Sequence, residues 1–291
     1  MRLMLRIISF LALALILIVL FGTSLWLLKS HLDLWARPNR IGVLEIRGVI
    51  TEAESPIKSL KAFRKDSNIR AILIRIESPG GGVGPCQEIY RELIRTRQHK
   101  PVVASLGGIA ASGGYYIASA ATRIIASPGT LTGSIGVVVH FPNLKGLFKK
   151  IGYSMVTIKS GQFKDSGNPA RDMTPGEKEL FQSLADEVHK QFIRDVSRGR
   201  KLPLPKLQKV ADGRIISGEK AVQLGLVDQL GNFEDAVETA ARLGHIKGEP
   251  KLIYAEREKS PILRWLLGKI DTCNLLTFFD MREPLRYQFV P

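Results

Sequence analysis

The sequence predicts an α/β fold in which helices cover a layered sheet. Two observations support this prediction. Short apolar runs rich in β-branched residues alternate along the chain with stretches of helical periodicity, a pattern typical of strands connected by helices. The chain has 291 residues, of which 45% are hydrophobic, and this is enough to build a sizeable core within one α/β unit.

The first predicted strand covers residues 41–50, IGVLEIRGVI, in which apolar and polar side chains alternate. This alternation indicates one buried face and one solvated face. Residues 68–76 include the apolar run AILIRI and predict a more deeply buried strand. Further strands are expected at residues 102–105, 123–126 and 135–140.

Four helices are expected, at residues 85–97, 174–198, 217–224 and 232–243. Thr174 and Glu177 have the spacing of a capping box, and Pro175 suits the first position of a helix. Apolar residues recur every four positions over residues 180–196, so this long helix is predicted to form one wall of the core or a subunit contact. Ser217 is expected to cap the helix that follows it.

The formal net charge of +15 raises the question of an anionic partner. The lysines and arginines are scattered, and no zinc-finger or RNA-binding signature accompanies them, so we do not expect nucleic-acid binding. Anionic lipid headgroups explain the charge equally well. The two cysteines, Cys86 and Cys273, could form one disulfide, but Cys86 is better interpreted as a small apolar residue on a helix.

Residues 7–28 form an uncharged apolar run near the N-terminus, long enough for a helix to cross a hydrocarbon core of about 30 Å. Basic residues lie on both sides of the run, so their count does not fix its orientation. A short basic N-terminus before a first apolar span resembles a signal anchor and favours it over a cleaved signal peptide. We therefore expect a transmembrane anchor over residues 1–29, a linker over residues 30–40, and the remainder of the chain outside the cytoplasm.

Ser112 lies within a stretch of small residues, LGGIAASGGYYIASA, at positions 106–120. Glycines allow sharp bends and close approach of another molecule, so this serine is a candidate nucleophile. Its attack needs a nearby base and N–H donors for the resulting oxyanion. The amide of Gly113 and the glycine-rich loop after Ser78-Pro79 are candidate donors. The loop GGGVG lacks the GK[ST] sequence of a phosphate-binding loop.

The residues alone leave the base undecided between a histidine, an acid and a lysine. Lys164 lies in a glycine-flanked segment, and a lysine acts as a base only when burial or a positive charge depresses its pKa. His140 ends an apolar run, so a Ser/His pair with Ser112 remains an alternative. No cluster has metal-ligand spacing, so no cofactor is expected.

Five motifs follow one another in the chain: the SPGGGV loop, LGGIAASGGYYIASA, TGSIGVV at residues 132–138, SGQFKDSGNPARDMT at residues 160–174 and SGEKAVQLGLVDQLG at residues 217–231. Together they resemble the signal peptide peptidase A family of bacterial membrane-bound Ser/Lys proteases. The resemblance implies that Ser112 is the nucleophile and Lys164 the general base, oriented by Ser134. It also implies that Gly113 and Gly81 are the oxyanion donors.

The same resemblance implies a Clp protease/crotonase-like fold of ββα units over residues 41–248, followed by an extension of unknown role at residues 249–291. It implies a homo-oligomer with sites near subunit contacts that degrades cleaved signal peptides and similar apolar peptides at the inner membrane. Whether the serine and lysine of one site come from the same subunit or from adjacent subunits stays open at this point. The alternatives are a non-catalytic membrane scaffold and an acyl-CoA-binding protein of crotonase type. Within the extension, residues 262–270 resemble a short amphipathic helix, for which core packing or an oligomer contact is favoured over a membrane surface. Residues 287–291 are a candidate product-like peptide for the groove.

Overall fold

A computed structural model describes residues 10, 13–27, 39–256 and 286–288. The chain divides into two compact units, Met1–Pro38 and Asn39–Pro291. In the first unit, residues 13–27 are helical. Among the described residues, no helix combines the length and the apolar character that a bilayer crossing needs. The anchor predicted over residues 1–29 lies partly outside these ranges and stays a prediction.

The second unit is built on an eight-stranded sheet with the order β7-β6-β4-β2-β1-β9, in which β5 pairs with β4 and β8 pairs with β5. The pairs are parallel, apart from the antiparallel pair of β6 and β7. Its strands are β1 (Arg40–Arg47), β2 (Ile69–Ser78), β4 (Val102–Ala111), β5 (Arg123–Ala126), β6 (Leu131–Gly133), β7 (Ile215–Ser217), β8 (Gln229–Leu230) and β9 (Lys251–Tyr254).

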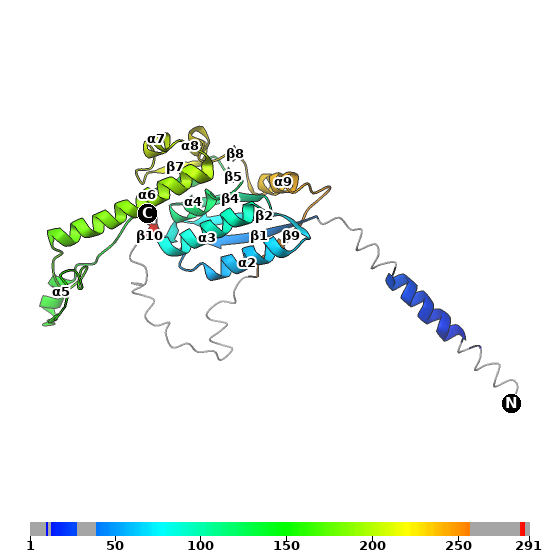
Figure 1. Cartoon of the computed structure of the whole chain (residues 1–291), viewed down its shortest axis with the longest axis horizontal. Coiled ribbons are helices and arrows are strands. Elements are labelled where there is room, and N and C mark those ends of the chain that lie inside the picture. The colour runs from blue at the N-terminus through cyan, green and yellow to red at the C-terminus, as the bar shows by residue number, and fades with distance from the viewer. Residues whose placement is uncertain (1–9, 11–12, 28–38, 257–285, 289–291) are drawn as a thin grey trace, which may run out of the picture. The chain divides into compact units, whose positions relative to one another are not determined.

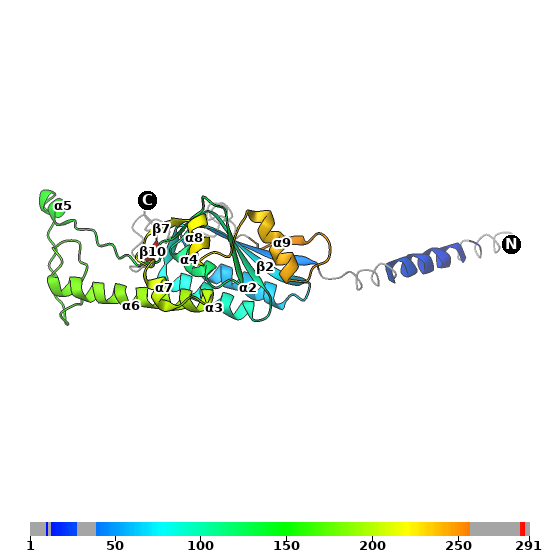
Figure 2. The same ribbon diagram turned by 90° about the horizontal axis from the view of Figure 1, so that it is seen from above.

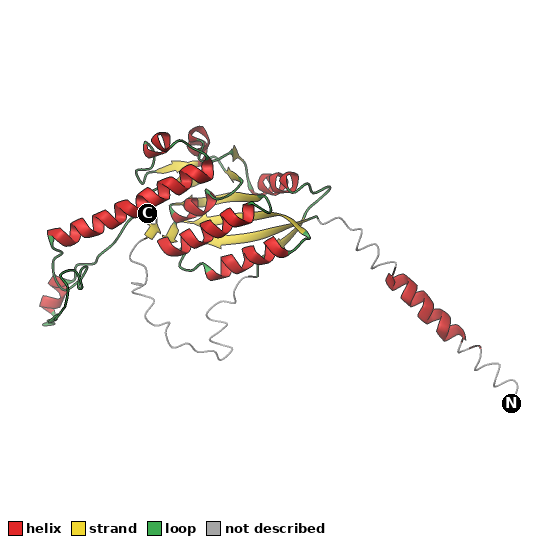
Figure 3. Ribbon diagram, in the orientation of Figure 1, coloured by secondary structure: helices red, strands yellow, loops and turns green. Residues whose placement is uncertain are grey.

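Helices cover both faces of this sheet (Figures 1 and 3). The larger core lies on one face, against α2 (Glu54–Lys65), α3 (Val83–Arg97) and α4 (Gly113–Ala118). The opposite face packs against α9 (Phe233–Leu243) through a smaller apolar cluster. Successive residues of a strand point to opposite faces of the sheet. A sheet with helices on both faces therefore needs apolar residues at successive positions, and β1 and β2 have them.

The structure confirms most of the predicted elements and corrects one of them. Residues 135–140 do not form the expected strand. The chain leaves the sheet after β6, because Gly133 and Ser134 both have a positive φ, +78° and +49°, that breaks the extended backbone. The edge of β6 that faces away from β4 is already paired with β7, so β6 offers no free edge to a further strand.

The helix α6 (Pro175–Arg200) begins with the predicted capping box of Thr174 and Glu177. Only its C-terminal half packs into the core, where Phe192 and Val196 are buried. Towards its N-terminus Leu184 is exposed. Within this chain, therefore, only the C-terminal half of the predicted apolar face of this helix packs against the core. Two short helices follow, α7 (Leu204–Gln208) and α8 (Gly218–Leu224), and Ser217 caps α8 as predicted.

The N-terminal half of α6 and the segment before it project from the sheet (Figure 2). We call residues 141–186 the arm. It contains α5 (Lys145–Lys150), in which no residue is buried. The arm is therefore held mainly by the continuity of α6 with the body.

The C-terminal half of α6 lies very close to the end of α4. A Cβ atom at Gly199 would lie 2.2 Å from the backbone oxygen of Ser119. No side chain fits there, so Gly199 sets how closely the two helices approach each other.

We therefore expect Gly199→Ala to lower the free energy of unfolding by about 1–3 kcal/mol, because the added methyl group forces α6 away from α4. The matched control is Gly176→Ala in the same helix, where the new Cβ would lie 3.8 Å from Phe163. The control should be neutral or should raise stability by up to about 1 kcal/mol. Urea unfolding measures both variants, and equal effects would contradict the close-approach argument.

Candidate active site

Ser112 lies at the sharp turn between strand β4 and helix α4. Its φ is +54° and its ψ is −118°, an unusual conformation for a residue with a side chain. Such a conformation stores about 1–3 kcal/mol of strain, and positions of this kind cluster at functional sites. The residue is 1% exposed, and its hydroxyl does not cap α4. The structure therefore places Ser112 at a buried, strained turn, and its role as the nucleophile stays a prediction.

Strand β6 brings Ser134 beside Ser112. Ala111 pairs with Gly133 in parallel register, so the two serines follow at the same end of neighbouring strands. The amide of Ser112 donates to the Gly133 carbonyl at 2.8 Å, and the amide of Ser134 donates to the Arg214 carbonyl at 2.8 Å. Both serines are buried and both have a positive φ.

The glycine-rich loop forms a short strand, β3 (Gly80–Gly82). Ile50 binds one edge of it: its amide donates to the Gly80 carbonyl at 2.9 Å, and its carbonyl accepts from the Gly82 amide at 2.8 Å. Since peptide groups alternate along a strand, those of Gly81 face the other edge. A Cβ atom at Gly81 would lie 2.1 Å from the Ile50 oxygen, so only glycine fits.

The glycine loop also touches the start of helix α4. A Cβ atom at Gly114 would lie 2.8 Å from the Ser78 carbonyl oxygen. The amide of Gly113, as the first of its helix, has no carbonyl within the helix to bind. Two predicted oxyanion donors, Gly81 and Gly113, thus lie on segments that contact each other.

Strand β10 (Arg286–Gln288) pairs antiparallel with β3, and Tyr287 is opposite Gly81. Of the stretch 287–291 that was predicted to lie in the groove, residues 287 and 288 therefore lie along the glycine loop. Residues 289–291 and the predicted helix at 262–270 are outside the described ranges. The pairing shows that β3 accepts an extended peptide at its edge.

Lys164 and His140 are not brought to Ser112 in this chain. Lys164 lies on the arm between α5 and α6, and it is exposed, with its amide donating to the Gly161 carbonyl at 3.3 Å. His140 is exposed in the segment that leaves the sheet after β6. Within the described ranges, no hydrogen bond joins either side chain to Ser112 or Ser134.

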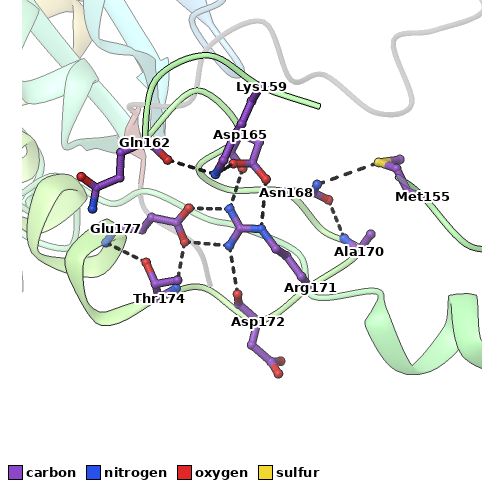
Figure 4. A network of polar contacts seen from close by, with 10 residues as sticks. All are labelled: Met155, Lys159, Gln162, Asp165, Asn168, Ala170, Arg171, Asp172, Thr174 and Glu177. Carbon is purple, nitrogen blue, oxygen red and sulfur yellow. Dashed lines mark hydrogen bonds and ion pairs between the residues drawn. The ribbon is translucent and has the colours of Figure 1, made fainter. Parts of the chain in front are cut away.

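An ionic network holds the segment around Lys164 (Figure 4). The Arg171 guanidinium donates to Asp165 Oδ2 at 3.1 Å and to both oxygens of Glu177, at 2.9 Å and 2.5 Å. Lys159 forms an ion pair with Asp165. Asp165 directly follows Lys164 in the sequence, and Glu177 lies in the first turn of α6. The network therefore connects the lysine segment to the start of this helix.

Both carboxylates of the network remain ionised at neutral pH. Hydrogen bonds from Arg171 and then from Lys159 lower the pKa of Asp165 to about 2. Arg171 and the Thr174 amide lower the pKa of Glu177 far below its usual range. The sequence alone identified neither Asp165 nor Arg171 as a member of this network, since a charged side chain in a polar loop gives no sign of its partner.

The arm exposes many apolar side chains to solvent, with Val156 at 87% and Ile158 at 96% exposure. An apolar surface of this kind marks an interaction site more often than an idle one. Its other exposed members are Leu147, Ile151, Tyr153, Met155, Phe163 and Leu184.

A pocket of about 310 Å³ opens beside Ser134. Asp186, His189 and Asp212 supply its titratable side chains. His189 Nε2 lies 3.1 Å from the Ile135 carbonyl oxygen, which joins α6 to the chain just after Ser134. Across the described residues, no three potential metal ligands converge.

The chain is similar to known proteases. The profile of peptidase family S49 matches residues 94–247, and that of Clp protease matches residues 41–131. The chain is 40% identical over 231 residues to "Putative protease slr0021" of Synechocystis, covering 79% of this chain and 83% of that protein. It is 30% identical to "Putative signal peptide peptidase SppA" of Enterococcus faecium (83% and 74%). It is 36% identical to "Serine protease SPPA, chloroplastic" of Arabidopsis thaliana (74% and 32%).

The ionic network predicts a pH dependence for the order of the Lys164 segment. Because the pKa of Asp165 is lowered to about 2 from about 3.9, its stabilising effect is complete above pH 4 and is lost as the pH falls towards 2. Hydrogen exchange at residues 159–172, corrected for intrinsic rates, should show constant protection from pH 7 to 5 and a decline below about pH 4. Arg171→Gln should abolish the protection at pH 7, and Lys178→Gln, which changes an exposed lysine of α6, is the control. Unchanged protection in Arg171→Gln would contradict this role.

Proposed function

Because the chain belongs to peptidase family S49 and is a serine peptidase with a Clp protease-like α/β domain, we propose that Ser112 is its nucleophile. The observation that carries this proposal is the strained, buried serine between β4 and α4, next to two glycine segments. Its Oγ attacks the scissile carbonyl carbon and loses its proton to a base. The acyl-enzyme forms when the amine of the cleaved bond departs with a proton, and water then hydrolyses the ester.

The oxyanion is stabilised by the amides of Gly113 and Gly81. Gly113 follows the nucleophile directly, and the peptide groups of Gly81 face away from Ile50. Donors fixed in the backbone need no rearrangement as charge develops on the substrate oxygen. The absence of side chains on both residues leaves room for the substrate.

Lys164 is the general base, and a neighbouring subunit supplies it. Its segment is ordered by Arg171 on an arm with an exposed apolar surface, which suits contact with a second copy. Entry beside Ser134 would remove the ammonium from water, and desolvation lowers a lysine pKa towards neutrality. The Ser134 hydroxyl then orients the neutral amine towards Ser112.

The substrates are apolar peptides, such as cleaved signal peptides, bound as an extended strand along β3. The antiparallel pairing of β10 with the same strand supports this mode, because main-chain hydrogen bonds give affinity with little regard to sequence. The uncharged run at residues 7–28 supports anchoring in the inner membrane, with the catalytic unit on the extracytoplasmic side.

Mixing two inactive variants tests the shared site. Ser112→Ala and Lys164→Ala should each abolish peptide cleavage, because each removes one member of the pair. If neighbouring subunits share sites, subunits mixed in equal amounts and reassembled should recover about a quarter of wild-type activity through random pairing. The readout is the cleavage rate of a fluorogenic apolar peptide.

The matched controls separate the alternatives. Each variant reassembled alone should stay inactive, and His140→Ala should remain active. Loss of activity in His140→Ala with activity kept in Lys164→Ala would favour a Ser/His pair. Absence of fluorophosphonate labelling at Ser112 in the wild type would favour a non-catalytic scaffold. Tight binding of acyl-CoA thioesters would favour a crotonase-type protein.

Removal of residues 286–291 tests whether β10 occupies the substrate edge of β3. We expect the truncated chain to have a lower KM for short peptides, because the edge no longer has to be vacated. The control replaces Tyr287 by alanine, which keeps the backbone pairing and should change KM less. Identical KM values in the truncated and full chains would show that peptides bind elsewhere.

A further inference from the structure

Strand β4 carries a bulge shortly before Ser112. Ile76 pairs with Leu106, but the next pair along the two strands is Ser78 with Ala110. One residue of β2, Glu77, is therefore opposite three residues of β4, at positions 107–109. Extra residues of a bulge lose their ladder partners, so their amides need other acceptors.

The side chain of Glu77 supplies those acceptors. Oε2 accepts from the Gly108 amide at 3.0 Å, and Oε1 accepts from the Ile109 amide at 3.1 Å. Hydrogen bonds to a carboxylate are about twice as strong as neutral ones. The two bonds also fix both oxygens at once, so they define the orientation of the bulge as well as its position.

The bulge is built to receive this carboxylate. A Cβ atom at Gly107 would lie 1.7 Å from Glu77 Oε2, so only glycine leaves space for it. The hydroxyl of Thr130 donates to the Gly107 carbonyl at 2.8 Å. The backbone of Glu77 is fixed as well, since its carbonyl accepts from the Gly48 amide at 2.9 Å.

We propose that Glu77 is a positioning residue that sets Ser112 against its oxyanion donors. This inference rests on the proposed function. Glu77 directly precedes the loop that carries Gly81, and its carboxylate holds the strand that reaches Ser112 three residues after Ile109. The two hydrogen bonds to the Glu77 carboxylate thereby fix the separation between Ser112 Oγ and the Gly81 amide. Glu77 touches neither the substrate nor the reacting atoms.

The test measures the rate at which a fluorophosphonate labels Ser112 in the full chain. In Glu77→Gln one oxygen becomes an NH2 group that faces an amide donor, so one bond is lost. In Glu77→Asp the side chain is too short to reach both amides. Each variant should label about tenfold to a hundredfold more slowly per folded molecule, since small misplacements have effects of this size. The kcat for peptide cleavage should fall in parallel, with KM nearly unchanged.

The matched control is Glu45→Gln on β1, one strand farther from β4, where the carboxylate forms an ion pair with Arg47. It should label at the wild-type rate. A merely structural role for Glu77 would lower the thermal midpoint while leaving the labelling rate of the folded fraction unchanged, and that result would overturn the proposal. Failure of the wild type to label would instead refute Ser112 as nucleophile, so the two failures are distinguishable.

Discussion

The hydrogen bond from the Ser112 amide to the Gly133 carbonyl is the contact on which the site depends. It joins the end of β4 to the end of β6 and holds Ser112 in a backbone conformation that its side chain disfavours. The parallel sheet keeps Ser112 in this conformation, because its buried backbone hydrogen bonds and its two covering helical layers outweigh the strain of one residue. Ser134 gains its position from the same pair of strands.

The arm is stabilised differently from the body. The sheet is held by apolar burial, whereas the segment around Lys164 is held by Arg171 between two carboxylates. Glu177 serves both the capping box of α6 and this network, so the start of the helix and the lysine segment are ordered together. The ion pair between Arg171 and the buried carboxylate of Glu177 thus orders this part of the chain, where no apolar core is available.

Features that depend on neighbouring residues in sequence were predictable. The caps at Thr174 and Ser217 act within one helical turn, and the glycines around Ser112 restrict backbone geometry locally. The prediction of a strand at residues 135–140 was wrong. A strand needs a free sheet edge to pair with, and a local sequence pattern does not reveal whether an edge is free. Glu77 and Arg171 were missed because their partners depend on the fold, and a charged residue in isolation is typical of a solvated surface.

The exposed arm has a consequence for how the amount of enzyme relates to its activity. If the lysine comes from a neighbour, a single chain holds a nucleophile with no base and is latent until it assembles. Near the assembly threshold, the number of working sites would then rise more steeply than the number of chains. Small changes in expression would produce large changes in proteolysis, and newly made chains would be harmless to one another while they fold.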